Sequence, residues 1–155
     1  VSRVQKLDGK AALKLADAVW LTQGDIRQLQ LAKGAVRTGI DFLLHKAGLD
    51  CRELDRVIVG GGFGNVLRPA SLEGVGMLPP GTGEKVLFAG NTSQLGCVRL
   101  LLSAAARSKL EQDMVGVEHI GLAQDAAFMD SFVQNMVFPE PKSLSLELSP
   151  VDGEM

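Results

Sequence analysis

Two glycine-rich stretches carry the residue types best suited to binding chemistry in this sequence. The first, "VIVGGGFGN", follows a short apolar run and consists of Gly60, Gly61, Gly62, Phe63, Gly64 and Asn65. Glycines at the end of a strand let main-chain N–H groups face a ligand without intervening Cβ atoms, and they adopt positive φ at little cost. A phosphate or the edge of a nucleoside is the usual ligand of such a turn. A tight turn that only allows close helix–sheet packing is the alternative, and the pattern leaves both open.

The second stretch, "FAGNTSQLG", repeats the arrangement. Gly90, Asn91 and Thr92 stand at the end of another apolar run and directly before a predicted helix. Unpaired N–H donors and the helix dipole at such a position favour anions or polar ligand edges. Thr92 or Ser93 is equally suited to serve only as the N-cap of the helix. Two turns of this kind therefore indicate a ligand site more strongly than one.

Neither stretch fits the two common phosphate-binding patterns. A dinucleotide fingerprint, Gly-x-Gly-x-x-Gly, would need its third glycine where the chain has Asn65 or Leu67. The P-loop pattern, Gly-x-x-x-x-Gly-Lys-Ser/Thr, does not occur in the sequence. If the turns bind a nucleotide, they do so in another architecture.

The elements that lead to the first turn have clear local signals. Asp8-Gly9 lies between two alternating runs and predicts an N-terminal β-hairpin with strands near residues 2–7 and 11–20. Thr22, three residues before Asp25, predicts the start of a long amphipathic helix. Gly48 marks its end. "DRVIVG" then predicts a short buried strand that ends in the glycines.

The second half of the chain predicts further alternation of helices and strands. We expect a helix from Pro69 through "ASLEGVGML", a strand in "KVLFAGN", a helix over 93–107, a strand in "VEHIGL" and a closing helix in "DAAFMDSFVQNMVF". Residues 1–137 are thus predicted to form an α/β domain whose sheet is covered by helices, and residues 138–155 a C-terminal tail.

Composition limits the class of protein. The chain has 155 residues, is 46% hydrophobic and has a formal net charge of −2. Its basic residues are scattered, which argues against nucleic-acid binding, and no apolar run is long enough for a membrane span. The two cysteines stand far apart with no histidine at ligand spacing, so no metal site is predicted and a reducing cytoplasm is expected. Because the sequence opens on Val1 rather than methionine, we expect a piece of a longer polypeptide.

An ordered set of motifs resembles a known family. The runs "LTQGDIRQLQLAKGAVRTGIDFLL", "LDRVIVGGGFGNVL", "GMLP", "FAGNTSQLGC" and "FMDSFVQNMVFP" are similar to the C-terminal domain of reductive activators of corrinoid proteins, which include ferredoxin-domain-containing metal-binding proteins. Nearly the whole chain is covered. That resemblance implies an actin-like, ribonuclease H-like ATPase subdomain, as in actin, sugar kinases and heat-shock chaperones.

The resemblance also implies roles for particular residues. Residues 60–64 take the role of the turn that lies against adenosine and phosphate, and the long helix with Gln30 and Lys33 flanks the base. Asn65 either points its amide at the nucleotide or a partner, or is a plain turn residue. On pattern alone, a solvated lysine is the usual role of a residue such as Lys33.

The function implied by the resemblance is ATP-driven electron delivery from an N-terminal [2Fe-2S] domain to cob(II)alamin in a methyltransferase. A plant-type cluster needs four cysteines, so this chain cannot hold it and the cluster would lie upstream, as would the Mg²⁺ ligands of the ATP site. The implied partner is a corrinoid protein or methyltransferase, with a homodimer also possible. ATP hydrolysis is expected only with the upstream half.

Two other interpretations remain open. In one, the chain is a non-catalytic docking or dimerisation module whose glycine turns are structural. In the other, it is related to sugar or acyl kinases, although no acidic catalytic base can be identified in it.

Overall fold

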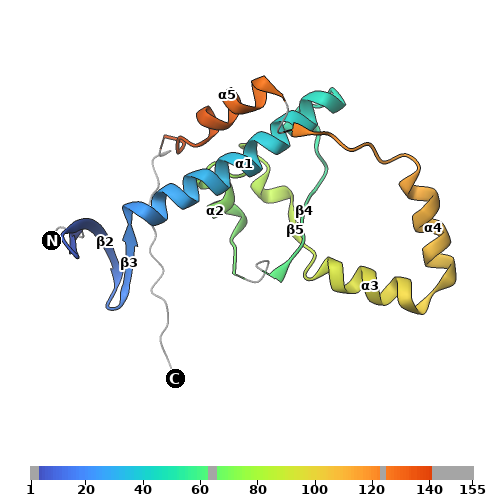
Figure 1. Cartoon of the computed structure of the whole chain (residues 1–155), viewed down its shortest axis with the longest axis horizontal. Helices are drawn as coiled ribbons and strands as arrows, with labels where there is room; N and C mark the ends of the chain where they lie inside the picture. The colour runs from blue at the N-terminus through green and yellow to red at the C-terminus, as the bar shows by residue number, and fades with distance from the viewer. Residues whose placement is uncertain (1–3, 63–65, 123–124, 141–155) are drawn as a thin grey trace.

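A three-stranded antiparallel sheet begins the described part of the chain (Figure 1). The computed structural model describes residues 4–62, 66–122 and 125–140. Strands β1 (Val4–Leu7) and β2 (Lys10–Ala16) form the predicted hairpin, in which Asp8 and Gly9 have φ values of 49° and 78°. Positive φ at both central residues is the geometry that an Asp-Gly turn favours, so this prediction is confirmed.

The predicted strand over 11–20 is wrong in its length. The chain turns after β2 and returns as β3 (Val19–Thr22), which pairs antiparallel with β2. Lys14 forms a 3.5 Å ion pair with Asp17, and its ammonium lies 5.8 Å from the centroid of the Trp20 ring. Asp17 is a residue type that favours turns. The apolar pattern around it nevertheless predicts an uninterrupted strand.

The long helix α1 (Gln23–Ala47) begins and ends where the sequence predicts. The Thr22 hydroxyl accepts a hydrogen bond from the Asp25 backbone N–H at 3.2 Å, and the Asp25 carboxylate accepts one from the Thr22 N–H at 2.8 Å. This is a complete capping box. Gly48 ends the helix in the left-handed conformation, with φ 67°. Two local signals therefore fix the helix that runs through the centre of Figure 1.

Two predicted strands form a parallel pair. β4 (Val57–Val59) and β5 (Val86–Phe88) pair in register from Val57↔Val86 to Val59↔Phe88. Between them the chain forms α2 (Pro69–Gly74), with Pro69 in the first turn as predicted. The expected continuation of this helix through Leu78 is wrong, because Gly76 has a φ of 77°, which no α-helix contains.

Two further predictions in the second half need correction. The single helix expected over 93–107 is two helices, α3 (Thr92–Leu102) and α4 (Ala104–Met114). They are separated at Ser103, whose extended backbone (φ −136°) breaks the first helix and whose hydroxyl caps the second. No strand forms over 117–122: in the described residues this segment pairs with neither β4 nor β5, and Glu118 forms a 3.1 Å ion pair with Lys46.

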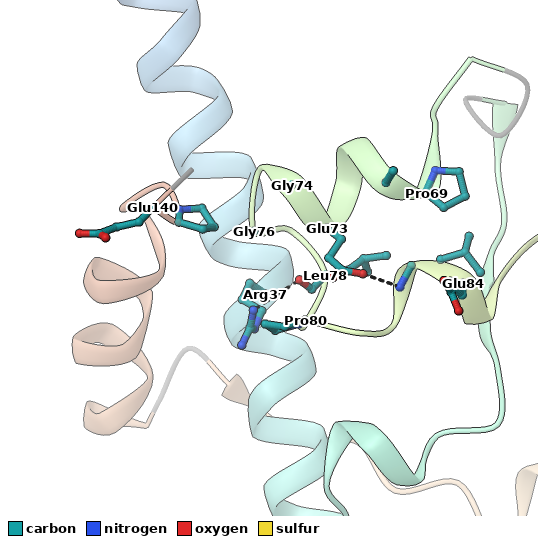
Figure 2. Close-up of a pocket in the computed structure, with 13 residues that line it drawn as sticks. Arg37, Pro69, Glu73, Gly74, Gly76, Leu78, Pro80, Glu84 and Glu140 are labelled. Atoms are coloured by element: carbon teal, nitrogen blue, oxygen red, sulfur yellow. Dashed lines mark hydrogen bonds between the residues drawn. The ribbon is translucent and has the colours of Figure 1, made fainter. Parts of the chain in front are cut away.

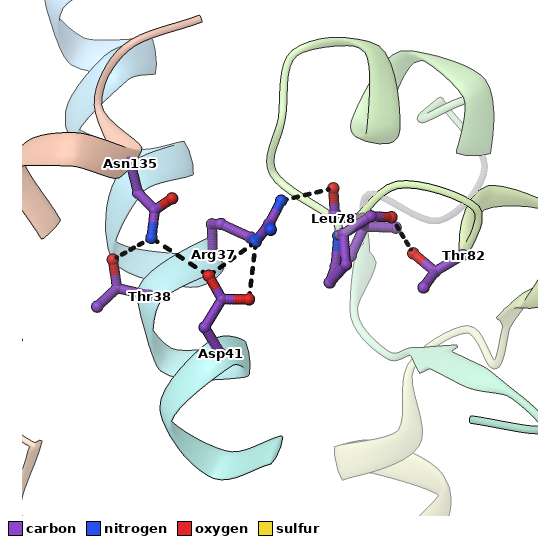
Figure 3. Close-up of polar contacts among 7 residues, drawn as sticks. Arg37, Thr38, Asp41, Leu78, Thr82 and Asn135 are labelled. Carbon is purple, nitrogen blue, oxygen red and sulfur yellow. Dashed lines mark hydrogen bonds and ion pairs between the residues drawn. The ribbon is translucent and has the colours of Figure 1, made fainter. Parts of the chain in front are cut away.

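The predicted closing helix, α5 (Ala126–Asn135), is confirmed and packs along α1 (Figure 1). Phe128 stacks with Phe132 at 6.4 Å and meets Phe42 of α1 edge-on at 5.5 Å. Figure 3 shows the polar side of this interface, where Asn135 donates hydrogen bonds to the Thr38 hydroxyl at 3.0 Å and to Asp41 at 3.4 Å. Residues 141–155 of the predicted tail lie outside the described residues.

Removal of the capping hydroxyl should weaken α1. We expect Thr22→Ala to lower the free energy of unfolding by about 0.5–2 kcal/mol, because the Asp25 backbone N–H loses its acceptor and the Asp25 carboxylate loses the hydroxyl that donates to it at 2.7 Å. Denaturant unfolding measures this. Ser93→Ala is the control, since Asn91 rather than Ser93 caps α3. Equal effects of the two substitutions would contradict the role of the capping box.

Candidate functional site

The two glycine turns lie side by side at one edge of the parallel pair. Beyond the strands, the ladder continues with hydrogen bonds from the Ala89 N–H to the Val59 carbonyl at 2.9 Å and from the Gly61 N–H to the Gly90 carbonyl at 2.7 Å. Parallel strands have their carboxyl ends at the same edge, and this edge is where open α/β sheets bind ligands. The structure thus brings together Gly60, Gly61 and Gly62 with Gly90 and Thr92.

Gly60 has a packing reason to be glycine. A Cβ atom at this position would lie 2.6 Å from the Thr92 hydroxyl oxygen, closer than real Cβ atoms approach. The first residue of α3 therefore packs directly on the first turn. Packing alone therefore explains why residue 60 is glycine, and no ligand is needed to explain it.

The other glycines have different reasons. Gly61 and Gly90 have φ values of 118° and 64°, which L side chains rarely adopt. Gly62 has neither restriction within the described residues, because a Cβ there would meet none of them within 4 Å and its φ is not in the left-handed region. In the described part of the chain, no packing contact therefore requires glycine at position 62. Bare backbone facing open space is what a turn that contacts a ligand would present.

Asn91 is the N-cap of α3, which corrects the expectation that Thr92 or Ser93 has this role. Its side-chain oxygen accepts a hydrogen bond from the Gln94 N–H at 3.1 Å. The N-terminus of this 11-residue helix lies next to both turns, and its dipole favours negative charge there. The predicted contacts Phe63, Gly64 and Asn65 lie outside the described residues and stay predictions.

Lys33 is not the solvated lysine that its pattern favours. It is 1% exposed, its ammonium donates a hydrogen bond to the Val137 carbonyl, and the ring centroid of Phe138 lies 5.2 Å from Nζ. Burial, and next the nearby charge of Arg37, lower the pKa of Lys33 from its usual 10.5. Gln30 is half-buried on the same helix. In the described residues, no hydrogen bond or ion pair joins Gln30 or Lys33 to either turn.

A cavity of about 700 Å³, which the sequence analysis missed, lies between α1, α2 and the start of β5 (Figure 2). Its lining residues are Arg37, Pro69, Ala70, Glu73, Gly74, Gly76, Leu78, Pro80, Gly83, Glu84, Val86, Pro139 and Glu140. Val86 begins β5, whereas Gly90 follows its end, so the cavity and the glycine turns lie toward opposite ends of this strand. Its size is typical of small-molecule sites.

Polar contacts hold the cavity's walls. The Glu73 carboxylate accepts 2.8 Å hydrogen bonds from the N–H groups of Gly81 and Gly83, which ties α2 to the loop before β5. Arg37 Nε lies 2.9 Å from both Asp41 oxygens, and its Nη1 donates to the Leu78 carbonyl at 3.4 Å (Figure 3). No sequence pattern indicates these contacts beyond the i, i+4 spacing of Arg37 and Asp41.

Comparison with known proteins assigns the domain. The family described as "C-terminal domain of RACo the ASKHA domain" matches residues 3–147. The chain belongs to this family. A solved structure of a "Reductive activator for corrinoid,iron-sulfur protein" superposes with a TM-score of 0.79 and 29% identity, over 88% of this chain and 23% of that one. The family and this superposition confirm the predicted fold class, an actin-like α/β domain with helices over a sheet.

A curated relative gives the same assignment. The "Corrinoid activation enzyme RamQ" of Eubacterium limosum is 31% identical over 118 residues, which are 76% of this chain and 20% of that protein. This chain thus spans about a fifth of the length of each of these two relatives. None of the helices in its described residues is long and apolar enough to cross a membrane.

The contact between Gly60 and Thr92 predicts a coupled pair of substitutions. We expect Gly60→Ala to destabilise the chain by about 1–3 kcal/mol through overpacking. In a Thr92→Ala background this cost should fall, because the obstructing hydroxyl is gone. A double-mutant cycle on the free energy of unfolding measures the coupling. Gly62→Ala in both backgrounds is the control, and equal coupling for both glycines would contradict the packing account.

Lys33 predicts a pH dependence of stability. Its folded-state pKa lies below 10.5, so the folded state binds fewer protons than the unfolded state between the two values. The contribution of Lys33 to the free energy of unfolding should therefore rise with pH towards 10.5. We expect the stability difference between the wild type and Lys33→Met to shift in favour of the wild type from about pH 7 to about pH 10. A constant or opposite difference would contradict the lowered pKa.

Proposed function

We propose that this chain is the nucleotide-binding C-terminal part of an ATP-dependent reductive activator of corrinoid proteins. The observation that carries the proposal is the pair of adjacent glycine turns, with a Gly62 at which a Cβ atom would meet none of the described residues within 4 Å. Membership of the family of the RACo C-terminal domain supports it. The relatives' names supply the class of partner, a corrinoid protein.

The turns fit the adenosine and phosphate of ATP by their chemistry. Among the described residues, no side chain obstructs the backbone at Gly62, and the amino end of α3 favours anionic oxygens. Gly60 and Thr92 would fix the spacing of the two turns, and Gly61 and Gly90 would join them. Phe63, Gly64, Asn65 and Gln30 are the further contacts that we propose. Lys33 is not among them, because it is 1% exposed and its ammonium is bonded to the Val137 carbonyl. Bound ATP would supply the free energy of hydrolysis, with Mg²⁺ held by residues outside this chain.

The [2Fe-2S] cluster does not fit this chain. Cys51 is half-buried near the end of α1 and Cys97 is exposed on α3, and the sequence has only these two cysteines, whereas a plant-type cluster takes four. These two residues therefore cannot hold the cluster through which electrons would pass. Electron delivery to cob(II)alamin of a methyltransferase, in the cytoplasm, is proposed for the whole activator, with the cluster in another part of it.

Exposed apolar side chains support the proposal that other parts of a larger protein cover this domain. Ile58 and Leu87 in the parallel strands are 66% and 50% exposed, and Leu101 and Leu102 at the end of α3 are 80% and 83% exposed. A two-stranded sheet is marginal by itself. We propose that the rest of the activator completes both the sheet and the ATP cleft.

The same surface favours the second candidate, a docking or dimerisation module with structural turns. In that case α3 would bind a partner or a second copy, and the turns would bind no nucleotide. The two candidates differ in what a change at Gly62 does. Only in the first should it alter nucleotide affinity.

Gly62→Val should weaken ATP binding by the full-length protein, because the added side chain fills the space in front of the turn. We expect a loss of about tenfold or more, equivalent to about 1.4 kcal/mol, measured by isothermal titration. Gly116→Val is the matched control, since Gly116 also has open space around its Cβ position and lies in a turn after α4.

The outcome separates the two candidates. Weakened ATP binding in folded Gly62→Val, with wild-type affinity in Gly116→Val, would support the nucleotide site. Wild-type affinity in both variants would remove Gly62 from the site. A full-length protein that binds no ATP at all would favour the docking module.

A further inference from the structure

We propose that Lys33 is a positioning residue that ties the segment after α5 to α1 and so builds one wall of the cavity. This role does not require nucleotide binding. It concerns residues 137–140, of which Pro139 and Glu140 line the cavity. The proposal rests on two contacts of the Lys33 ammonium and on a third contact beside it, between Gly76 and Pro139.

The first contact is a charge-assisted hydrogen bond. A buried ammonium is costly unless it is paired or hydrogen-bonded, and at 1% exposure Lys33 receives little solvation from water. Its Nζ donates to the carbonyl of Val137, just past the end of α5. The C-terminal end of a helix favours a nearby cation, so the end of α5 helps to stabilise the Lys33 ammonium. The bond spans 104 positions in the sequence.

The second contact is aromatic. The Phe138 ring centroid lies 5.2 Å from Nζ, within the range of a cation–π interaction. Successive residues of the segment thus contact one ammonium, Val137 by its carbonyl and Phe138 by its ring. This fixes the direction in which the chain leaves α5 and continues to Pro139.

The third contact joins the segment to the loop after α2. A Cβ atom on Gly76 would lie 2.8 Å from Pro139 Cγ and 3.4 Å from Lys33 Nζ. Gly76, Pro139 and the ammonium are therefore packed together at the edge of the cavity that Figure 2 shows. On α1, Gly34 lets the end of α5 approach, since a Cβ there would lie 3.3 Å from the Met136 nitrogen.

These contacts place Lys33 behind the wall rather than in the cavity. It does not line the cavity, but the residues that it holds do. Loss of its ammonium should release residues 137–140 while the rest of α5 stays on α1 through the Asn135–Thr38 hydrogen bond. The wall next to Gly76 would then be free to move.

Amide hydrogen exchange on the full-length protein tests this, with Lys33→Met, Lys33→Arg and Lys46→Met as variants. Lys46 lies on the same helix but pairs at the surface with Glu118. We expect Lys33→Met to speed exchange at the Val137 amide by about tenfold or more, with much smaller changes elsewhere in α1 and α5. Lys33→Arg should restore part of the protection, and Lys46→Met should leave it unchanged.

A spectroscopic measurement on the wild type provides a second test that needs no variant. The ε-methylene protons of Lys33 should show an upfield shift from the Phe138 ring, which an exposed lysine lacks. Three results would overturn the proposal: equal exchange at Val137 in Lys33→Met and Lys46→Met, faster exchange spread evenly over the chain, or an ordinary ε-methylene shift for Lys33.

Discussion

The hydrogen bond from the Gly61 N–H to the Gly90 carbonyl joins the two stretches in which a ligand site was expected. It extends a parallel ladder of only three paired residues per strand. Without this extension, the turns after β4 and β5 would leave the sheet independently. With it, the N-terminus of α3 and the bare backbone at Gly62 face the same edge of the sheet.

Buried polar groups join α5, and the segment after it, to α1. Lys33 and Thr38, both on α1, are 1% and 0% exposed, and each bonds to α5 or to the segment after it. Buried apolar residues are few in the described part of the chain, and two of them, Leu72 and Leu78, belong to the region around α2. The position of α5 on α1 thus depends on specific hydrogen bonds as well as on the phenylalanine contacts. Such contacts orient the elements more than apolar burial alone does.

Local signals in the sequence were sufficient for the features that depend on neighbouring residues. The capping box at Thr22, the left-handed Gly48 and the Asp-Gly hairpin were all predicted and are confirmed. The errors arose where one residue interrupts a regular pattern, as Ser103 does between α3 and α4. The strand expected over 117–122 failed for another reason: its pattern was suitable, but strand pairing depends on a partner that the pattern does not specify.

In the candidate site, too, some features follow from neighbouring residues and others depend on residues far apart in the sequence. The two turns could be predicted because each has its own glycines, but the separate reasons for Gly60 and Gly62 depend on where Thr92 lies. The cavity could not be predicted, because it is formed by residues as far apart as Arg37 and Glu140. The burial of Lys33 depends on a carbonyl 104 positions away, so a sequence pattern favours solvent exposure instead.

We propose that the two turns act as one nucleotide-facing edge. Amide hydrogen exchange of the full-length protein, with and without ATP, tests it most directly. We expect saturating ATP to slow exchange at Gly62 and at the first turn of α3 together, with the same dependence on ATP concentration. Saturable ATP binding that leaves both turns unchanged, or protects only one of them, would contradict it.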